Sequence, residues 1–203
     1  YEGLGRITNN NAFLLFAILM AAINTTFHKY TGEDKFVAGT SRINEDGNVT
    51  PNVFPVVLEV DKNRSFRDFL LHIREQLIED FNHQDYPYSR LIEDLQWEDD
   101  SDHFPLFSCA VTLEKFNLDM PEINNDIHIH FTNTHELTSV IRYKSSYTGS
   151  SLLRFMQHVS HILTMALEDI NSKITDLKIF SGDEEQRIIR AGAGNVTDLS
   201  QAL

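Results

Sequence analysis

The spacing of apolar residues along the chain predicts a series of helices separated by extended segments. The clearest helical pattern follows Ser65, where apolar residues recur every three or four positions opposite a charged face; they are Phe66, Phe69, Leu70, Ile73, Leu77 and Phe81. Ser65 and Asp68 have the spacing of a capping box. The helix must stop near Tyr86, because the residue before Pro87 disfavours helical backbone. A shorter helix is predicted over 88–95.

An earlier helix, apolar on nearly every face, is predicted from the asparagines at 9–11 to about Tyr30. Asparagine side chains cap helix starts, and Gly32 suits a helix end. A helix of this kind is normally buried inside a protein. Its apolar stretch, 12–23, is shorter than the roughly 20 residues that span a bilayer, and no basic leader precedes it as in a signal peptide. We therefore expect no membrane association.

The remaining patterns are mostly extended. Strands are predicted at 35–40, 53–60, 106–113, 127–131 and 137–143, and a last extended segment at 174–180. Pro55 restricts the second strand to a strand start or a sheet edge. A long helix begins at Ser150 or Ser151, and Ser181 caps a short acidic helix. This order predicts an α/β fold with helices packed on a largely antiparallel or mixed sheet.

Length and charge limit the possible functions. A chain of 203 residues is enough for one domain or for one lobe of a larger two-lobe protein. With 30 acidic and 17 basic residues, its net charge is −13, which would repel nucleic-acid phosphates and anionic membranes. Cys109 is the only cysteine, so no internal disulfide forms, which fits a reducing cytoplasm. Its apolar surroundings favour a buried structural thiol over a nucleophile.

Two histidine pairs invite a metal-binding interpretation. Two histidines two positions apart on a strand share a face and could share a metal, with nearby residues adding ligands; these are His128, His130, His135 and Glu136. A polar strand face opposite buried apolar residues is the stronger interpretation, because so short a pattern often occurs by chance. For His158 and His161, three apart on a helix, we expect a solvated or capping role. We assign no metal or catalytic residue, since no nucleophile elbow or phosphate-binding glycine loop is present.

The segment from His83 to Tyr88 reads His-Gln-Asp-Tyr-Pro-Tyr and places a histidine near an aspartate at a helix end. It resembles the sixth core motif, HQDxPF, of condensation domains in nonribosomal peptide synthetases. Further segments match that family in the same order, including 21–40, 61–75, 90–95, 143–163 and 176–197, and Pro105-Leu106 resembles the end of the seventh motif. The resemblance implies a structural, family-marking role for seven residues: His83, Gln84, Asp85, Tyr86, Pro87, Pro105 and Leu106.

The resemblance also implies a fold and partners. It implies that residues 1–180 form the C-terminal half of a chloramphenicol-acetyltransferase-like architecture, and that 181–203 form an exit linker towards an adenylation domain. The expected partners are that adenylation domain and a carrier protein, on which phosphopantetheine resides; no cofactor is expected in this chain. The implied location is the cytoplasm. The family's catalytic signature, HHxxxDG, belongs to the N-terminal lobe and does not occur here.

Two further family motifs are altered. The fifth, FVNTLxLR, aligns with 52–59, where Phe54, Pro55 and Glu59 replace the asparagine, threonine and arginine. The seventh, RDxSRNPL, has Asp99 and His103 in place of its arginines. Replacing arginine by a carboxylate reverses the charge at a site suited to a fork-shaped ion pair.

Three functions can be compared with these features, and two of them fit. A truncated, non-catalytic lobe could serve as a docking platform, as the missing signature and altered motifs indicate. Alternatively, the chain is the C-terminal half of an active condensation domain that joins carrier-bound thioesters by amide bonds, as its start at Tyr1 without methionine suggests. An unrelated α/β interaction domain fits poorly with so many segments matching in order.

Overall fold

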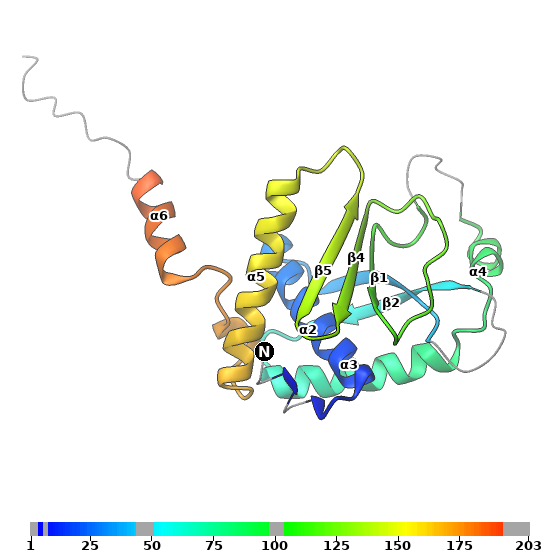
Figure 1. Ribbon diagram of the computed structural model, residues 1–203, viewed down its shortest axis with the longest axis horizontal. Helices are drawn as coiled ribbons and strands as arrows, with labels where there is room; N and C mark the ends of the chain where they lie inside the picture. Colours follow the sequence, from blue (N-terminus) through cyan, green and yellow to red (C-terminus); the bar gives the residue numbers. More distant parts are fainter. Residues whose placement is uncertain (1–3, 6–7, 44–50, 98–103, 193–203) are drawn as a thin grey trace, which may run out of the picture.

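The computed structural model describes residues 4–5, 8–43, 51–97 and 104–192, which form one sheet with helices packed against it (Figure 1). The sheet has five strands in the order β2-β1-β3-β4-β5. Its strands are β1 (Lys35–Ser41), β2 (Val53–Glu59), β3 (Cys109–Leu113), β4 (Ile127–Asn133) and β5 (Leu137–Tyr143). The β1–β3 and β3–β4 pairs are parallel, while β1–β2 and β4–β5 are antiparallel, so the predicted mixed sheet is confirmed.

The central helix is α2 (Ala12–Thr31), which the sequence pattern predicted closely. Asn11 accepts a hydrogen bond from the Leu14 amide at 3.0 Å, and Gly32 ends the helix with a φ of 76°. Every residue from 15 to 26 is buried, as expected for a helix apolar on all sides. By length and composition α2 could span a membrane. The length argument made from the sequence was therefore wrong, and burial within the fold explains the helix's composition instead.

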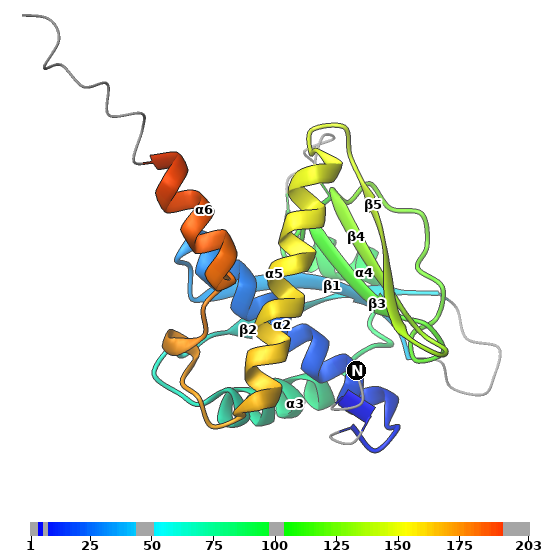
Figure 2. The same cartoon turned by 60° about the vertical axis from the view of Figure 1, so that its left-hand side comes forward.

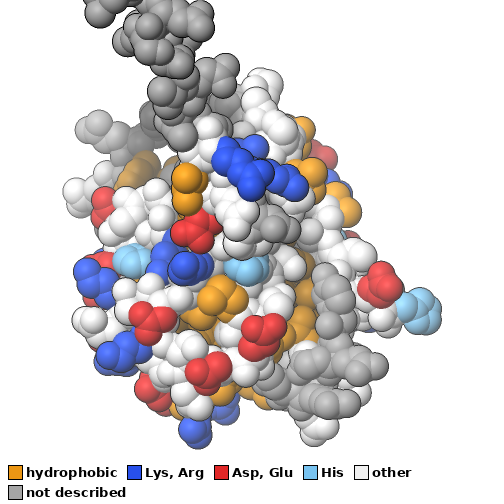
Figure 3. All heavy atoms as spheres, turned by 90° about the vertical axis from the view of Figure 1, so that its left-hand side faces the viewer, with side chains coloured by type: hydrophobic (Ala, Val, Ile, Leu, Met, Phe, Trp, Pro, Cys, Tyr) orange, Lys and Arg blue, Asp and Glu red, His pale blue; other side chains and the backbone are white. Residues whose placement is uncertain are grey.

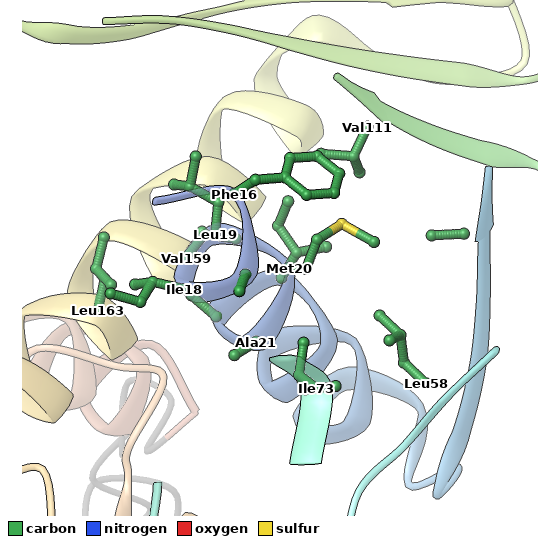
Figure 4. Close-up of a cluster of buried hydrophobic side chains, with 14 of the residues drawn as sticks. Phe16, Ile18, Leu19, Met20, Ala21, Leu58, Ile73, Val111, Val159 and Leu163 are labelled. Atoms are coloured by element: carbon green, nitrogen blue, oxygen red, sulfur yellow. The ribbon is translucent and has the colours of Figure 1, made fainter. Parts of the chain in front are cut away.

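Two further long helices, α3 (Phe66–Asn82) and α5 (Gly149–Glu168), pack against α2. Figure 4 shows Phe16 and Met20 of α2 directed towards the sheet side of the cluster, with Val159 and Leu163 of α5 on another side. Val111, Leu58 and Ile73 add contributions from the sheet and α3. Burying each such side chain contributes about 1.5–3 kcal/mol to folding. Because α2 contacts α3, α5 and the sheet, it forms the centre of the hydrophobic core.

The structure corrects several predicted boundaries. α3 ends at Asn82, four residues before Tyr86, where the chain turns so that Gln84 points inward. β3 begins at Cys109, because Leu106 has a φ of 70° and cannot lie in a strand. The N-cap of α5 is Thr148 instead of Ser150 or Ser151. In place of an extended segment over 174–180, the chain forms a short 3-10 helix, η1 (Ile174–Asp176).

The remaining predicted elements agree with the structure. α4 (Tyr88–Asp94) lies after Pro87, and α6 (Gly182–Gly192) follows Ser181, whose hydroxyl accepts from the Glu184 amide at 3.3 Å. Figure 2 shows α6 leaving the lobe beside α5. Pro55 lies in β2, at an edge of the sheet, as predicted. Asp99 and His103 of the altered seventh motif lie outside the described residues.

Candidate functional site

The turn from His83 to Tyr88 is held by an asparagine from a distant loop. The side-chain amide of Asn52 donates to the carbonyls of Gln84 and Tyr86, at 2.9 and 2.8 Å. Its oxygen accepts from the Tyr88 amide at 3.2 Å. These three bonds lie on both sides of Pro87, so the Asn52 side chain satisfies backbone groups at the junction between α3 and α4.

The polar side chains of this turn have separate partners. Gln84 is buried, and its side-chain oxygen accepts from the Ile43 amide at 2.9 Å. Asp85 forms an ion pair with Arg42 at 2.5 Å, whereas the exposed His83 lies 3.3 Å from Glu79. His83 and Asp85 therefore do not act as an acid–base pair in this arrangement. The turn thus links the end of α3 to residues 42–43 and to Asn52.

The second motif segment, Pro105-Leu106, meets the first through an aromatic cluster. The Tyr88 hydroxyl donates to the Pro105 carbonyl, and its ring stacks on Phe104 with centroids 4.8 Å apart. Phe107 packs edge-on against Tyr88 and covers Gly39, where an added Cβ would lie 2.1 Å from the Phe107 ring. Burial raises the pKa of Tyr88, so the hydroxyl stays protonated and able to donate. The structure thus brings the two family-motif segments together.

The altered fifth motif has local structural roles. Phe54 packs against Phe81 of α3, with ring centroids 5.5 Å apart. Pro55 is opposite Gly39 in the β1–β2 ladder, and Glu59 forms an exposed ion pair with Lys35 at 3.5 Å. The three replacements fit an edge strand attached to α3, without forming a polar site.

A polar cavity of about 1030 Å³ lies on the face of the sheet where β4 exposes its histidines. The Thr112 hydroxyl is 2.8 Å from His128 Nε2 and 2.9 Å from His130 Nδ1, so both rings converge on one oxygen. Burial, and then the charges of His130 and Arg142, lower the pKa of His128 to about 4. His128 is consequently neutral at neutral pH.

The metal-binding interpretation gains no further ligands from the fold. The predicted polar strand face is confirmed, because Ile127, Ile129 and Phe131 are buried on the opposite side of β4. His135 is exposed beyond the end of that strand. Among the residues that the structure describes, no three histidine, cysteine, aspartate or glutamate side chains are grouped to hold a metal.

Cys109 is buried at the start of β3, as predicted. Burial raises the pKa of its thiol from 9.0 to about 12. A thiol that remains protonated is a poor nucleophile, and Cys109 packs in the hydrophobic core.

The prediction for His158 was wrong. Its side chain is only 2% exposed and lies between the Tyr30 hydroxyl, 2.6 Å from Nδ1, and the Glu184 carboxylate, 3.1 Å from Nε2. Phe180 packs edge-on against the ring, with centroids 5.3 Å apart. His158 thus connects α2, α5 and α6. The three-residue spacing of His158 and His161 gave no sign of this, because the partners lie far away in sequence.

Taken together, these features define an α/β fold whose motif residues hold its own segments together. The protein-family model named "Condensation domain" matches residues 2–189 of the chain. The chain therefore belongs to the condensation-domain family of nonribosomal peptide synthetases, with a chloramphenicol-acetyltransferase-like fold.

Curated relatives include surfactin synthase subunit 1 of Bacillus subtilis, 24% identical over 90% of this chain and 6% of that protein. Gramicidin S synthase 2 of Brevibacillus brevis is 26% identical over 93% of this chain and 5% of that protein. The chain thus spans only a small part of the length of the curated relatives it matches.

Solved structures show the same fold at low identity. A four-domain nonribosomal peptide synthetase bound to AMP and glycine aligns with a TM-score of 0.76 at 17% identity, covering 91% of this chain and 17% of the other. The X-domain from teicoplanin biosynthesis aligns with a TM-score of 0.73 at 14% identity, covering 88% of this chain and 47% of the other. The match to the X-domain therefore corresponds to about half of that chain.

Proposed function

We propose that this chain is a C-terminal condensation-domain lobe that acts as a non-catalytic docking platform for the adenylation domain and carrier protein of its own synthetase. The proposal rests on the contacts of the HQDYPY turn, whose side chains bind groups of this same chain. Gln84 and Tyr88 bind the chain's own backbone, while His83 and Asp85 bind different side chains. A turn occupied in this way stabilises a surface and leaves no acid–base pair for chemistry.

Similarity to proteins of this fold supports a docking role. The X-domain is solved in a complex with OxyB from the same biosynthesis, and this chain aligns with it at a TM-score of 0.73. The relatives that share its family are large synthases. A lobe embedded in such an assembly would present its surface to adjoining domains in the cytoplasm.

The polar cavity favours a second candidate function. His128, His130 and Arg142 line a space large enough for a small molecule. In this alternative the chain is the C-terminal half of an active condensation domain, and the cavity contributes to a site completed by an N-terminal lobe. The carrier's phosphopantetheine would supply the thioesters, and the product would contain a new amide bond.

Amide formation by the native synthetase distinguishes the two functions. Donor and acceptor amino acids are loaded on their carrier proteins, and peptide products are measured by mass spectrometry for the wild type and His130→Ala. Binding of this chain to the adjacent adenylation–carrier segment is measured by calorimetry. The platform function predicts binding without an amide product that depends on His130. A product that falls in the variant would establish the alternative, and absence of binding would refute the platform.

A further inference from the structure

Strand β5 leaves one side of its backbone open. It is the last strand of the sheet, and Figure 2 shows it as the outermost one. Val140 is 56% exposed and Tyr143 is 46% exposed, although both are large apolar residues. The opposite edge strand, β2, carries Pro55, which weakens strand pairing. No proline interrupts β5.

The hydrogen-bonding register shows which β5 groups face outward. The Lys144 amide donates to the Asp126 carbonyl at 2.9 Å. Hydrogen-bonded and non-hydrogen-bonded pairs alternate along an antiparallel ladder, and β4 and β5 pair without a break from 127↔143 to 133↔137. Residues 138, 140 and 142 therefore bond to β4. Among the described residues, the amides and carbonyls of 137, 139, 141 and 143 point away from the sheet without a hydrogen bond.

We propose that β5 pairs with β5 of a second copy of this chain, antiparallel and centred on Val140. In this register 139 pairs with 141 and 137 pairs with 143 of the other copy. All four outward-facing residues thereby exchange hydrogen bonds. The two-fold axis passes at Val140, so the contact is isologous and closes as a dimer.

The side chains in this register are complementary. Val140 meets Val140 of the second copy, and Tyr143 lies beside the second Leu137, so both exposed apolar residues of β5 gain apolar neighbours. Glu136 is opposite Lys144, a pair of unlike charges, although Lys144 also contacts Asp126 within its own chain at 2.9 Å. Arg142 is opposite the neutral Thr138. Cross-strand pairs of these kinds stabilise antiparallel strands relative to alanine pairs.

The contact is small, so a weak dimer is expected. Each copy contributes a strand of 7 residues, and interfaces of such limited area typically belong to transient complexes. The proposal does not rest on the proposed function, because the pairing groups belong to the backbone edge of β5, although Arg142, Tyr143 and Lys144 also line the polar cavity.

Sedimentation equilibrium over a range of concentrations tests the dimer. The wild-type chain should shift from monomer to dimer as concentration rises. Val140→Lys should be monomeric, because two lysines would meet at the two-fold axis. Val57→Lys is the matched control, since Val57 lies on the other edge strand and is 49% exposed; it should dimerise like the wild type. Circular dichroism confirms that each variant is folded.

A mixing experiment tests the register itself. Val140→Lys and Val140→Glu should each be monomeric alone, whereas an equimolar mixture should form dimers, because lysine then meets glutamate at the axis. A monomeric wild type, a dimeric Val140→Lys, a monomeric Val57→Lys or a mixture that stays monomeric would each overturn the proposal. So would assembly beyond the dimer, because an isologous contact closes.

Discussion

Asn52 is the residue on which the HQDYPY turn depends most directly. Its side chain makes three hydrogen bonds to the backbone around Pro87. Replacing Asn52 by alanine should lower the free energy of unfolding by about 2 kcal/mol, since each bond has a net value of roughly 1 kcal/mol and the solvent-accessible part regains water. Urea unfolding followed by circular dichroism measures the change.

The control for this prediction is Asn63→Ala. Asn63 lies in an exposed turn, where its backbone amide, and not its side chain, binds Asp61. We expect a change of less than about 0.5 kcal/mol for this surface substitution. Equal destabilisation by the two substitutions would show that Asn52 has no special role in the turn.

His128 should make stability sensitive to acid. Its pKa falls from 6.5 to about 4 in the folded protein, so between these pH values the unfolded chain binds more protons. Stability is therefore lost as pH falls through this window. Compared with the wild type, His128→Gln should lose less stability between pH 6.5 and 4. Urea midpoints at several pH values measure this difference, which isolates His128 from carboxylates that titrate in the same range.

The matched control is His135→Gln, because His135 is exposed beyond β4. The free energy of unfolding of His135→Gln should change with pH as that of the wild type does. If His128→Gln and the wild type lose stability in parallel, the lowered pKa of His128 is refuted.

Sequence patterns identified the marker residues of the turn but not the residues that hold it. Gln84 and Pro87 belong to a contiguous motif, whereas Asn52 and Arg42 come from the two ends of a loop that reads only as polar. The same limit explains His158, whose partners Tyr30 and Glu184 are 128 and 26 positions away. Side chains that meet through tertiary structure leave no local spacing to detect.

At the scale of elements, the position of α6 depends on His158. The ring bonds to Glu184 of α6 and to Tyr30 of α2, and it is almost fully buried. His158→Phe preserves a ring but removes both hydrogen bonds and leaves their partners unpaired. If the free energy of opening α6 falls by about 1.5 kcal/mol, the population in which α6 is detached rises about tenfold. Limited trypsin cleavage after Arg187 or Arg190 should accelerate accordingly.

His161→Phe, one turn along α5, is the control and should be cleaved at the wild-type rate. The cleavage sites are located by mass spectrometry, so that opening of α6 is separated from global unfolding. Unchanged cleavage of His158→Phe would show that other contacts alone hold α6.

Element patterns were reliable where local chemistry alone determines the boundary. α2 runs from Ala12 to Thr31 because Asn11 and Gly32 cap its two ends. The predicted start of β3 is too early, since the apolar run includes Leu106, which has a left-handed backbone and packs in the cluster with Tyr88 and Phe107. The sequence pattern could not predict the order of the strands either. β1, β3 and β4 pair in parallel through long connections, which leave no local signal.

At the scale of the whole molecule, the question is whether this lobe is sufficient to fold alone. Its exposed large apolar residues are distributed over several elements, among them Val57 of β2, Val140 of β5, Leu153 of α5 and Ile189 of α6. On the face drawn in Figure 3, hydrophobic side chains form small groups separated by charged ones. Large continuous apolar patches are the usual mark of a surface severed from its partner, and this face has the opposite character.

Because its exposed large apolar residues are spread over several elements, the chain should remain soluble by itself and bind little of an apolar fluorescent dye at neutral pH. Dye fluorescence should rise in acid, together with loss of near-ultraviolet circular dichroism, because compact acid states expose hydrophobic surface while they keep secondary structure. The net charge of −13 also opposes aggregation at neutral pH. Strong dye binding by the native chain, or aggregation at low concentration, would identify the protein as half of a domain that needs its other lobe. Such a result would favour the catalytic alternative over the platform.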